Sequence, residues 1–138
     1  MTKAVFDLTI LKKDMPALAL HYGLKLVVLF GSRATGKTHA QSDLDVAILP
    51  EPELSFSDEN HLSSEIARIS GIKDVEIVNL KIAGPILLKN IMDSGITLYE
   101  KSPSTFSLYR MRAFKMFVES KPLRTIRDLK MHQFLTSH

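Results

Sequence analysis

The feature that most constrains the fold of this chain is a pair of apolar segments joined by a short polar stretch. Residues 24–30 read Leu-Lys-Leu-Val-Val-Leu-Phe, and residues 43–49 read Asp-Leu-Asp-Val-Ala-Ile-Leu. Short apolar runs of this kind are typical of strands that are buried inside a sheet. A parallel pair would need a long crossover, usually a helix, so the short connection predicts that these two strands are antiparallel neighbours.

The rest of the chain alternates helical and extended patterns. Pro85 suits the first turn of a helix, and Ser57 is a plausible N-cap for another. We expect helices over about 7–22 (with Pro16 as a point of interruption), 57–70, 85–94 and from 103 onward with a break or kink at Pro122, and further strands over 74–80 and 96–100. This order predicts an α+β fold, a small mixed sheet with flanking helices, in one domain spanning 1–138, with a core of about 7–100 and a helical tail of about 103–138.

Composition excludes several classes of protein. The chain has 138 residues, is 45% hydrophobic and contains no cysteine, so a disulfide framework and a thiolate metal site are excluded. No apolar run approaches the roughly 20 residues that cross a bilayer. The first residues lack the apolar stretch of a signal peptide, so we expect a cytoplasmic protein with no membrane partner.

Charge is unevenly distributed along the chain. Residues 101–138 carry 8 Lys or Arg against only Glu119 and Asp128, a net charge of +6, whereas residues 1–100 carry −3. The simplest interpretation is a helix with a solvated basic face, and the alternatives are contact with nucleic acid or with an acidic protein surface.

The junction between the two apolar segments has the residues of a nucleotide site. Gly31 and Ser32 end the first strand, and small residues there allow a phosphate to approach the backbone. Asp43 and Asp45, two residues apart on the second strand, point to the same face. Carboxylates and phosphate oxygens are the ligands that Mg²⁺ prefers, so we expect a Mg²⁺ site for a nucleoside triphosphate.

A different phosphate motif overlaps this stretch. Gly31, Gly36, Lys37 and Thr38 satisfy the P-loop pattern, which requires a helix starting at Lys37-Thr38. Only residues 39–42 separate Thr38 from the second strand, about one helical turn. We therefore expect Lys37 and Thr38 to lie in a solvated loop.

These residues resemble a known family. The pattern Phe-Gly-Ser-Arg-Ala-x-Gly followed by Ser-Asp-Leu-Asp, over residues 30–45, is similar to the signature of polymerase-beta-like nucleotidyltransferases, in particular the minimal nucleotidyltransferase group. The resemblance implies that Gly31, Ser32 and Ser42 bind the nucleotide and that Asp43 and Asp45 ligate one or two Mg²⁺ ions. Arg33 would either reach a phosphate or cap the loop.

The family also uses a third carboxylate from a neighbouring strand. Its pattern aligns Glu76 with that position, where an aspartate is usual, so Glu76 is our candidate third catalytic and metal-binding residue. Asp74 lies on the same face of the predicted strand and is the alternative.

The resemblance implies transfer of AMP from ATP to a hydroxyl. Members of the group often act as antitoxins beside a HEPN-type ribonuclease toxin, where the acceptor is a tyrosine of the toxin. The chain is too short to add an acceptor-binding domain, which favours a protein partner over nucleic acid. Two alternatives stay open: an antitoxin that acts by binding alone, suggested by Glu76 in place of aspartate, and transfer to RNA or a small molecule, suggested by the basic tail. Candidates for a docking patch, although residues of this kind are more often core positions, are Phe106, Phe114, Phe117, Leu129 and Phe134.

Overall fold

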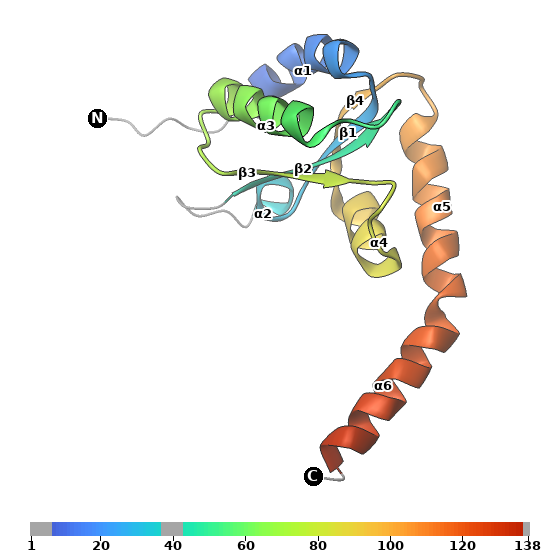
Figure 1. Cartoon of the computed structure of the whole chain (residues 1–138). Coiled ribbons are helices and arrows are strands. Elements are labelled where there is room, and N and C mark those ends of the chain that lie inside the picture. Colours follow the sequence, from blue (N-terminus) through green and yellow to red (C-terminus); the bar gives the residue numbers. More distant parts are fainter. Residues whose placement is uncertain (1–6, 37–42, 137–138) are drawn as a thin grey trace.

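The computed structural model describes residues 7–36 and 43–136. Its helices and strands alternate along the chain much as the sequence predicts (Figure 1). In chain order they are α1 (Leu8–Tyr22), β1 (Leu24–Phe30), α2 (Ser32–Thr35), β2 (Leu44–Pro50), α3 (Phe56–Ser70), β3 (Val75–Asn79), α4 (Pro85–Ser94), β4 (Ile96–Glu100), α5 (Thr105–Glu119) and α6 (Lys121–Thr136). No helix within the described residues is both long and apolar enough to span a bilayer.

The four strands form one mixed sheet in the order β3-β2-β1-β4. β1 pairs antiparallel with both β2 and β4, which confirms the antiparallel arrangement predicted from the short connection. β2 and β3 are parallel, because α3 provides the crossover between them. The predicted fold class, a small mixed sheet with flanking helices, is confirmed.

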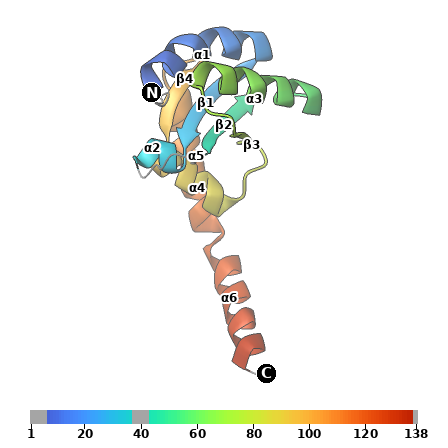
Figure 2. The ribbon, with the colours of Figure 1, turned by 90° about the vertical axis from the view of Figure 1, so that its left-hand side faces the viewer.

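Helices cover both faces of the sheet, as Figures 1 and 2 show. On one face, Val27 and Leu29 of β1 pack in a core cluster with residues of α1 and α3. On the other face, Leu26 and Val28 pack with residues of α4 and with Ala113 of α5. β1 is therefore buried on both sides, as its continuous apolar run predicts.

Two predicted helix boundaries were wrong by two residues. The N-cap of α3 is Ser55, whose Oγ accepts a hydrogen bond from the backbone N–H of Asp58 at 3.0 Å. Ser57 lies inside the first turn instead. Capping at Ser55 places Asp58 and Glu59 in that first turn, where negative charge complements the helix dipole.

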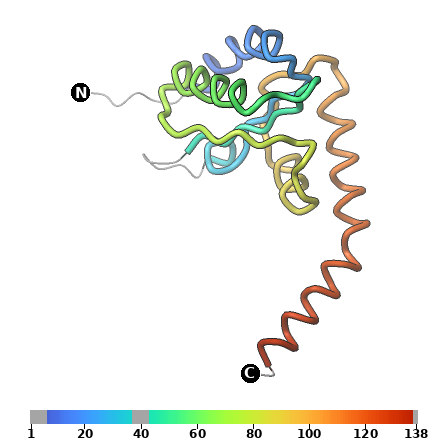
Figure 3. The backbone as a smooth tube through the Cα atoms, viewed as in Figure 1, coloured from blue at the N-terminus to red at the C-terminus, as the bar shows by residue number. Residues whose placement is uncertain are grey.

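The second correction concerns the tail. The interruption falls at Ser120, not at Pro122, because proline is compatible with the first turn of a helix and Pro122 lies in the first turn of α6. The backbone trace in Figure 3 shows the chain changing direction there and α6 running away from the sheet.

The tail helices differ in their packing. Ala113 of α5 is buried, and Phe106, Tyr109 and Met116 of the same helix pack against the core, whereas α6 has no buried residue. Of the five docking candidates, Phe106 is thus a packing residue. Phe117 is half-buried, and Phe114, Leu129 and Phe134 are exposed.

Candidate nucleotide and metal site

Three acidic residues meet where β2 and β3 begin. Asp43 immediately precedes β2, and Asp45 is the second residue of that strand. In the parallel pairing, Asp45 lies directly opposite Glu76 of β3. Residues opposite each other on adjacent strands have side chains on the same face, so the Asp45 and Glu76 carboxyl groups are neighbours.

The alternative third carboxylate, Asp74, has a different position. Asp74 precedes β3, and its backbone carbonyl accepts a hydrogen bond from the N–H of Leu44 at 2.9 Å. Its side chain is exposed and is not among the groups that shift the pKa of Asp45. The geometry therefore favours Glu76 over Asp74.

Gly31 lies against the Asp45 carboxylate. Its φ of 77° falls in the left-handed region, which strongly favours glycine. A Cβ built on Gly31 would overlap Oδ2 of Asp45 and lie 3.2 Å from its Cγ. Any side chain at position 31 would consequently displace the carboxylate, and a ligand bound to the Gly31 backbone would lie next to it.

A single helical turn, α2, follows Gly31 directly. The Gly31 carbonyl accepts hydrogen bonds from the N–H groups of Ala34 and Thr35 at 3.1 and 3.2 Å. The turn lies beside the end of β1 and the start of β2 (Figure 2). Ser32 and Arg33, both half-buried, are its first two residues. They are therefore held close to Asp43, Asp45 and Glu76, which we call the acidic cluster.

The negative charges of the acidic cluster repel one another. Burial, a hydrogen bond with Glu76 and the negative charges of Glu76 and Asp43 together raise the pKa of the Asp45 carboxyl to about 6. A cation beside these carboxylates would reduce their mutual repulsion.

These carboxylates fit a Mg²⁺ ion that is held jointly with a nucleotide better than one that is held by protein ligands alone. Within residues 7–36 and 43–136, no three acidic, histidine or cysteine side chains already surround one ion position. Asp45 and Glu76 contact each other, and Asp43 acts on Asp45 through its charge. Mg²⁺ is usually held by one or two carboxylates, with phosphate oxygens and water completing its shell, and this pair of adjacent carboxylates matches that pattern.

The P-loop alternative is wrong. β1 and β2 are antiparallel, and the helical turn begins at Ser32 and ends at Thr35, before the lysine of the motif. Lys37, Thr38 and the predicted nucleotide-binding residue Ser42 lie outside the described residues. The sequence reasoning did not foresee the contact between Gly31 and Asp45, for which a glycine at the end of a buried strand was the available signal.

Comparison with known proteins gives a consistent picture. The family model described as "Polymerase beta, Nucleotidyltransferase" matches residues 7–104. A protein adenylyltransferase, MntA, of Aphanizomenon flos-aquae (strain 2012/KM1/D3) is 30% identical over 122 residues, covering 81% of this chain and 81% of that protein.

Two solved structures show the same fold. A toxin–antitoxin structure with AMP-PNP superposes with a TM-score of 0.73 at 24% identity, covering 87% of this chain and 98% of the other. A tri-AMPylated HEPN toxin of Shewanella oneidensis in complex with an MNT antitoxin contains a chain that superposes with a TM-score of 0.70 at 21% identity, covering 91% and 99%.

Proposed function

Because this chain belongs to the polymerase beta nucleotidyltransferase family, we propose that it transfers AMP from ATP to a hydroxyl group of a partner HEPN-type toxin and so acts as an antitoxin. The observation that carries the proposal is the acidic cluster of Asp43, Asp45 and Glu76 beside Gly31. The relative named a protein adenylyltransferase supports protein as the acceptor. The structure containing an AMPylated HEPN toxin supports the toxin as the partner.

Each residue of the site has a proposed role. The backbone of Gly31 and the hydroxyl of Ser32 bind the triphosphate, with Arg33 and Ser42 as further nucleotide-binding residues. Asp43, Asp45 and Glu76 hold one or two Mg²⁺ ions. When bound, Mg²⁺ neutralises charge on the triphosphate and orients it for displacement.

The proposed acceptor is a tyrosine hydroxyl, whose ordinary pKa near 10 makes a general base useful. Its oxygen attacks the α-phosphorus of ATP, a new P–O bond forms, and the bond to the bridging oxygen breaks. Pyrophosphate leaves, and the hydroxyl proton passes to Glu76. Positioning and charge neutralisation supply most of the acceleration in such transfers.

The proposal is tested by Asp45→Asn, which removes a negative charge and preserves side-chain volume. We expect wild-type protein with ATP, Mg²⁺ and purified toxin to add AMP to the toxin, and Asp45→Asn to slow this transfer at least about a hundredfold, on the scale of lost electrostatic stabilisation. Intact-mass spectrometry of the toxin measures the product.

The matched control is Asp74→Asn, the same change at the neighbouring exposed carboxylate, which should retain transfer. Undiminished transfer by Asp45→Asn would remove Asp45 from the reaction. Equal loss in both variants would mean that the general negative charge of this edge matters, and that the specific cluster does not.

One observation favours a second candidate function. Glu76 is longer by one methylene than the family's usual aspartate, and Mg²⁺ tolerates little change in ligand geometry. An antitoxin that has lost transfer would neutralise the toxin by binding alone. Inhibition of the toxin by wild-type protein without ATP, equal to that with ATP and Mg²⁺, would support this candidate over the first.

A further inference from the structure

A hollow lies between the start of α4 and the start of α6. It has a volume of about 360 Å³, and we call it the tail slot. One wall is the segment Gly84–Leu87, and the other is formed by Leu123, Arg124 and Arg127. None of these residues belongs to the acidic cluster, and Gly84 follows the end of β3, whereas Glu76 lies at its beginning.

The α6 wall of the tail slot is held at a defined angle. Arg124 donates hydrogen bonds from Nε to Oγ of Ser120 at 3.0 Å and from Nη2 to the carbonyl of Phe117 at 2.8 Å. Its guanidinium also lies 3.9 Å from the centre of the Phe117 ring. These contacts connect the first turn of α6 to the last turn of α5.

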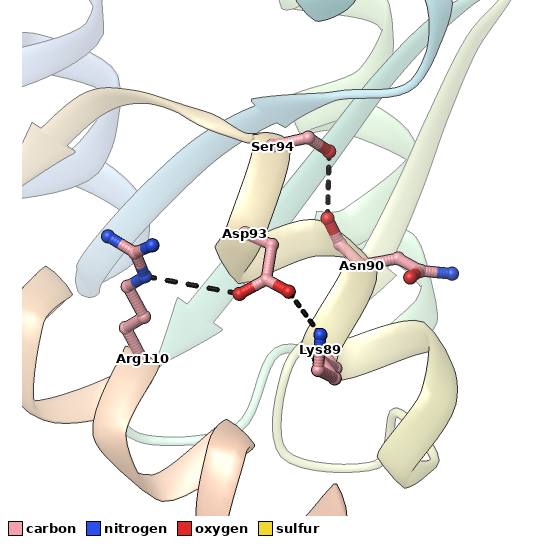
Figure 4. Close-up of polar contacts among 5 residues, drawn as sticks. All are labelled: Lys89, Asn90, Asp93, Ser94 and Arg110. Atoms are coloured by element: carbon pink, nitrogen blue, oxygen red, sulfur yellow. Dashed lines mark hydrogen bonds and ion pairs between the residues drawn. The ribbon is translucent and has the colours of Figure 1, made fainter.

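The α4 wall is anchored to α5 as well. Asp93 near the end of α4 forms ion pairs with Lys89 of the same helix and with Arg110 of α5, the latter at 4.0 Å (Figure 4). Leu88, Ile91 and Met92 of α4 are buried in the core cluster that contains Ala113 of α5. Both walls are thus fixed to the same helix, and the tail slot is preformed.

The tail slot opens onto a surface that is both apolar and basic. Leu123 is 72% exposed, and Ile86 and Leu87 on the opposite wall are also exposed. Further along α6, the exposed apolar side chains include Ile126, Leu129, Met131, Phe134 and Leu135. The same helix carries Lys121, Arg124, Arg127 and Lys130 against a single acidic residue, Asp128.

This combination matches one kind of partner. Exposed aliphatic groups in such number mark an interaction site, and they need apolar groups opposite them. The excess of cations needs carboxylates at the rim of the contact. A protein helix that presents aliphatic side chains next to Asp or Glu satisfies both requirements.

Two other occupants fit less well. A symmetric second copy would bring together two α6 helices, each of which carries four Lys or Arg against one Asp. RNA would satisfy the cations and leave the aliphatic side chains of α6 without apolar contacts, since single-stranded RNA is bound mainly on aromatic groups.

We propose that the tail slot and the face of α6 that carries Leu123 form the docking surface for the partner toxin, and that they receive an acidic amphipathic helix with an aliphatic side chain inserted in the tail slot. The identity of the partner as the toxin rests on the proposed function. Docking here is separate from the acidic cluster at the start of β2 and β3, so this surface sets affinity for the toxin and leaves the transfer step unchanged.

The test compares two substitutions that introduce the same charge on α6. Leu123→Glu places a carboxylate in the tail slot, and Thr125→Glu places one on an exposed position two residues on, about 200° around the helix. Neither residue is buried, so both variants should fold, which circular dichroism verifies. Toxin affinity is measured by isothermal titration calorimetry, and transfer by intact mass.

We expect Leu123→Glu to weaken toxin binding by at least about tenfold and to raise KM for the toxin with kcat unchanged, and Thr125→Glu to do neither. Unchanged affinity in Leu123→Glu, or an equal loss in both variants, overturns the docking proposal. So does concentration-dependent dimerisation, or RNA binding, that Leu123→Glu abolishes. Wild-type protein that binds the toxin and adds no AMP contradicts the proposed function, while the difference in affinity between the two variants still tests the docking surface.

Discussion

Gly31 illustrates how much one residue decides in this protein. It combines a left-handed backbone with close packing on the Asp45 carboxylate, and each of these conditions alone disfavours a side chain. Gly36, at the other end of the same helical turn, has a nearly identical φ of 79°, and no atom lies within 4 Å of the position that a Cβ would take. The two glycines differ in ψ, which is −158° at Gly31 and 3° at Gly36, so Gly31 has both a less tolerated backbone conformation and closer packing.

Substitution of each glycine by alanine measures what a side chain at that position costs in stability. We expect Gly36→Ala to lower the free energy of unfolding by about 1–2 kcal/mol, the cost of a left-handed alanine. Gly31→Ala should cost at least about 1 kcal/mol more, since its ψ of −158° is less accessible to alanine and overpacking adds to that cost. It should also abolish transfer, because it displaces Asp45. Urea denaturation gives the free energies. Equal destabilisation by both substitutions would contradict the packing role of Gly31.

The raised pKa of Asp45 predicts that the stability of the protein depends on pH. Its pKa in the folded protein, about 6, lies above the ordinary value of 3.8, so the folded state holds the proton more tightly than the unfolded state. The stabilisation from this proton is complete below about pH 4 and is lost as the pH rises through 6. Asp45→Asn cannot ionise.

Without divalent cations, we therefore expect Asp45→Asn to melt at a higher temperature than wild type at pH 8, and at a similar temperature at pH 4.5. Thermal melts in chelator at the two pH values measure the difference. A gap in melting temperature that is as large at pH 4.5 as at pH 8 would exclude the ionisation of Asp45 as its cause.

At the scale of elements, most helix and strand positions follow from local pattern. The buried run 24–30, the alternation near residue 76 and Pro85 at a helix start each lie where the sequence predicts. The error at the start of α3 arose because that helix end offers two similar residues, Ser55 and Ser57. A cap depends on whether the backbone before it is extended, and Ser55 has that conformation, with φ −69° and ψ 160°.

The corrected cap of α3 has a measurable consequence. Ser55→Ala removes the acceptor for the Asp58 N–H and should lower the free energy of unfolding by about 0.5–2 kcal/mol. Ser57→Ala, in the first turn of the helix, should change it by less than about 0.5 kcal/mol or raise it slightly, since alanine has the higher helix propensity. Chemical denaturation of the two variants distinguishes the positions, and a larger loss at Ser57 would restore the original assignment.

At the scale of the whole molecule, the two ends of the central strands are used differently. The acidic cluster and Gly31 lie where β1 ends and β2 and β3 begin, and α4 and the tail helices follow from the other end of β3 (Figure 1). We propose that α5 belongs with the nucleotidyltransferase core, against which it packs, and that α6 alone serves as a docking tail. With this division a short chain could act on a large acceptor, because in the proposed reaction the partner supplies the acceptor hydroxyl.

The sequence by itself determined the antiparallel β1–β2 pair, the position of Asp43 and Asp45 at the start of the second strand, and the glycine-serine bend before them. These features depend on neighbouring residues and on strand periodicity, which can be read from a short window. Only the tertiary structure decided that Glu76, and not Asp74, stands opposite Asp45, because the register of β3 on β2 joins segments about thirty residues apart and cannot be read from a short window. It also decided which apolar tail residues stay exposed, since helical periodicity shows an apolar face without showing what covers it.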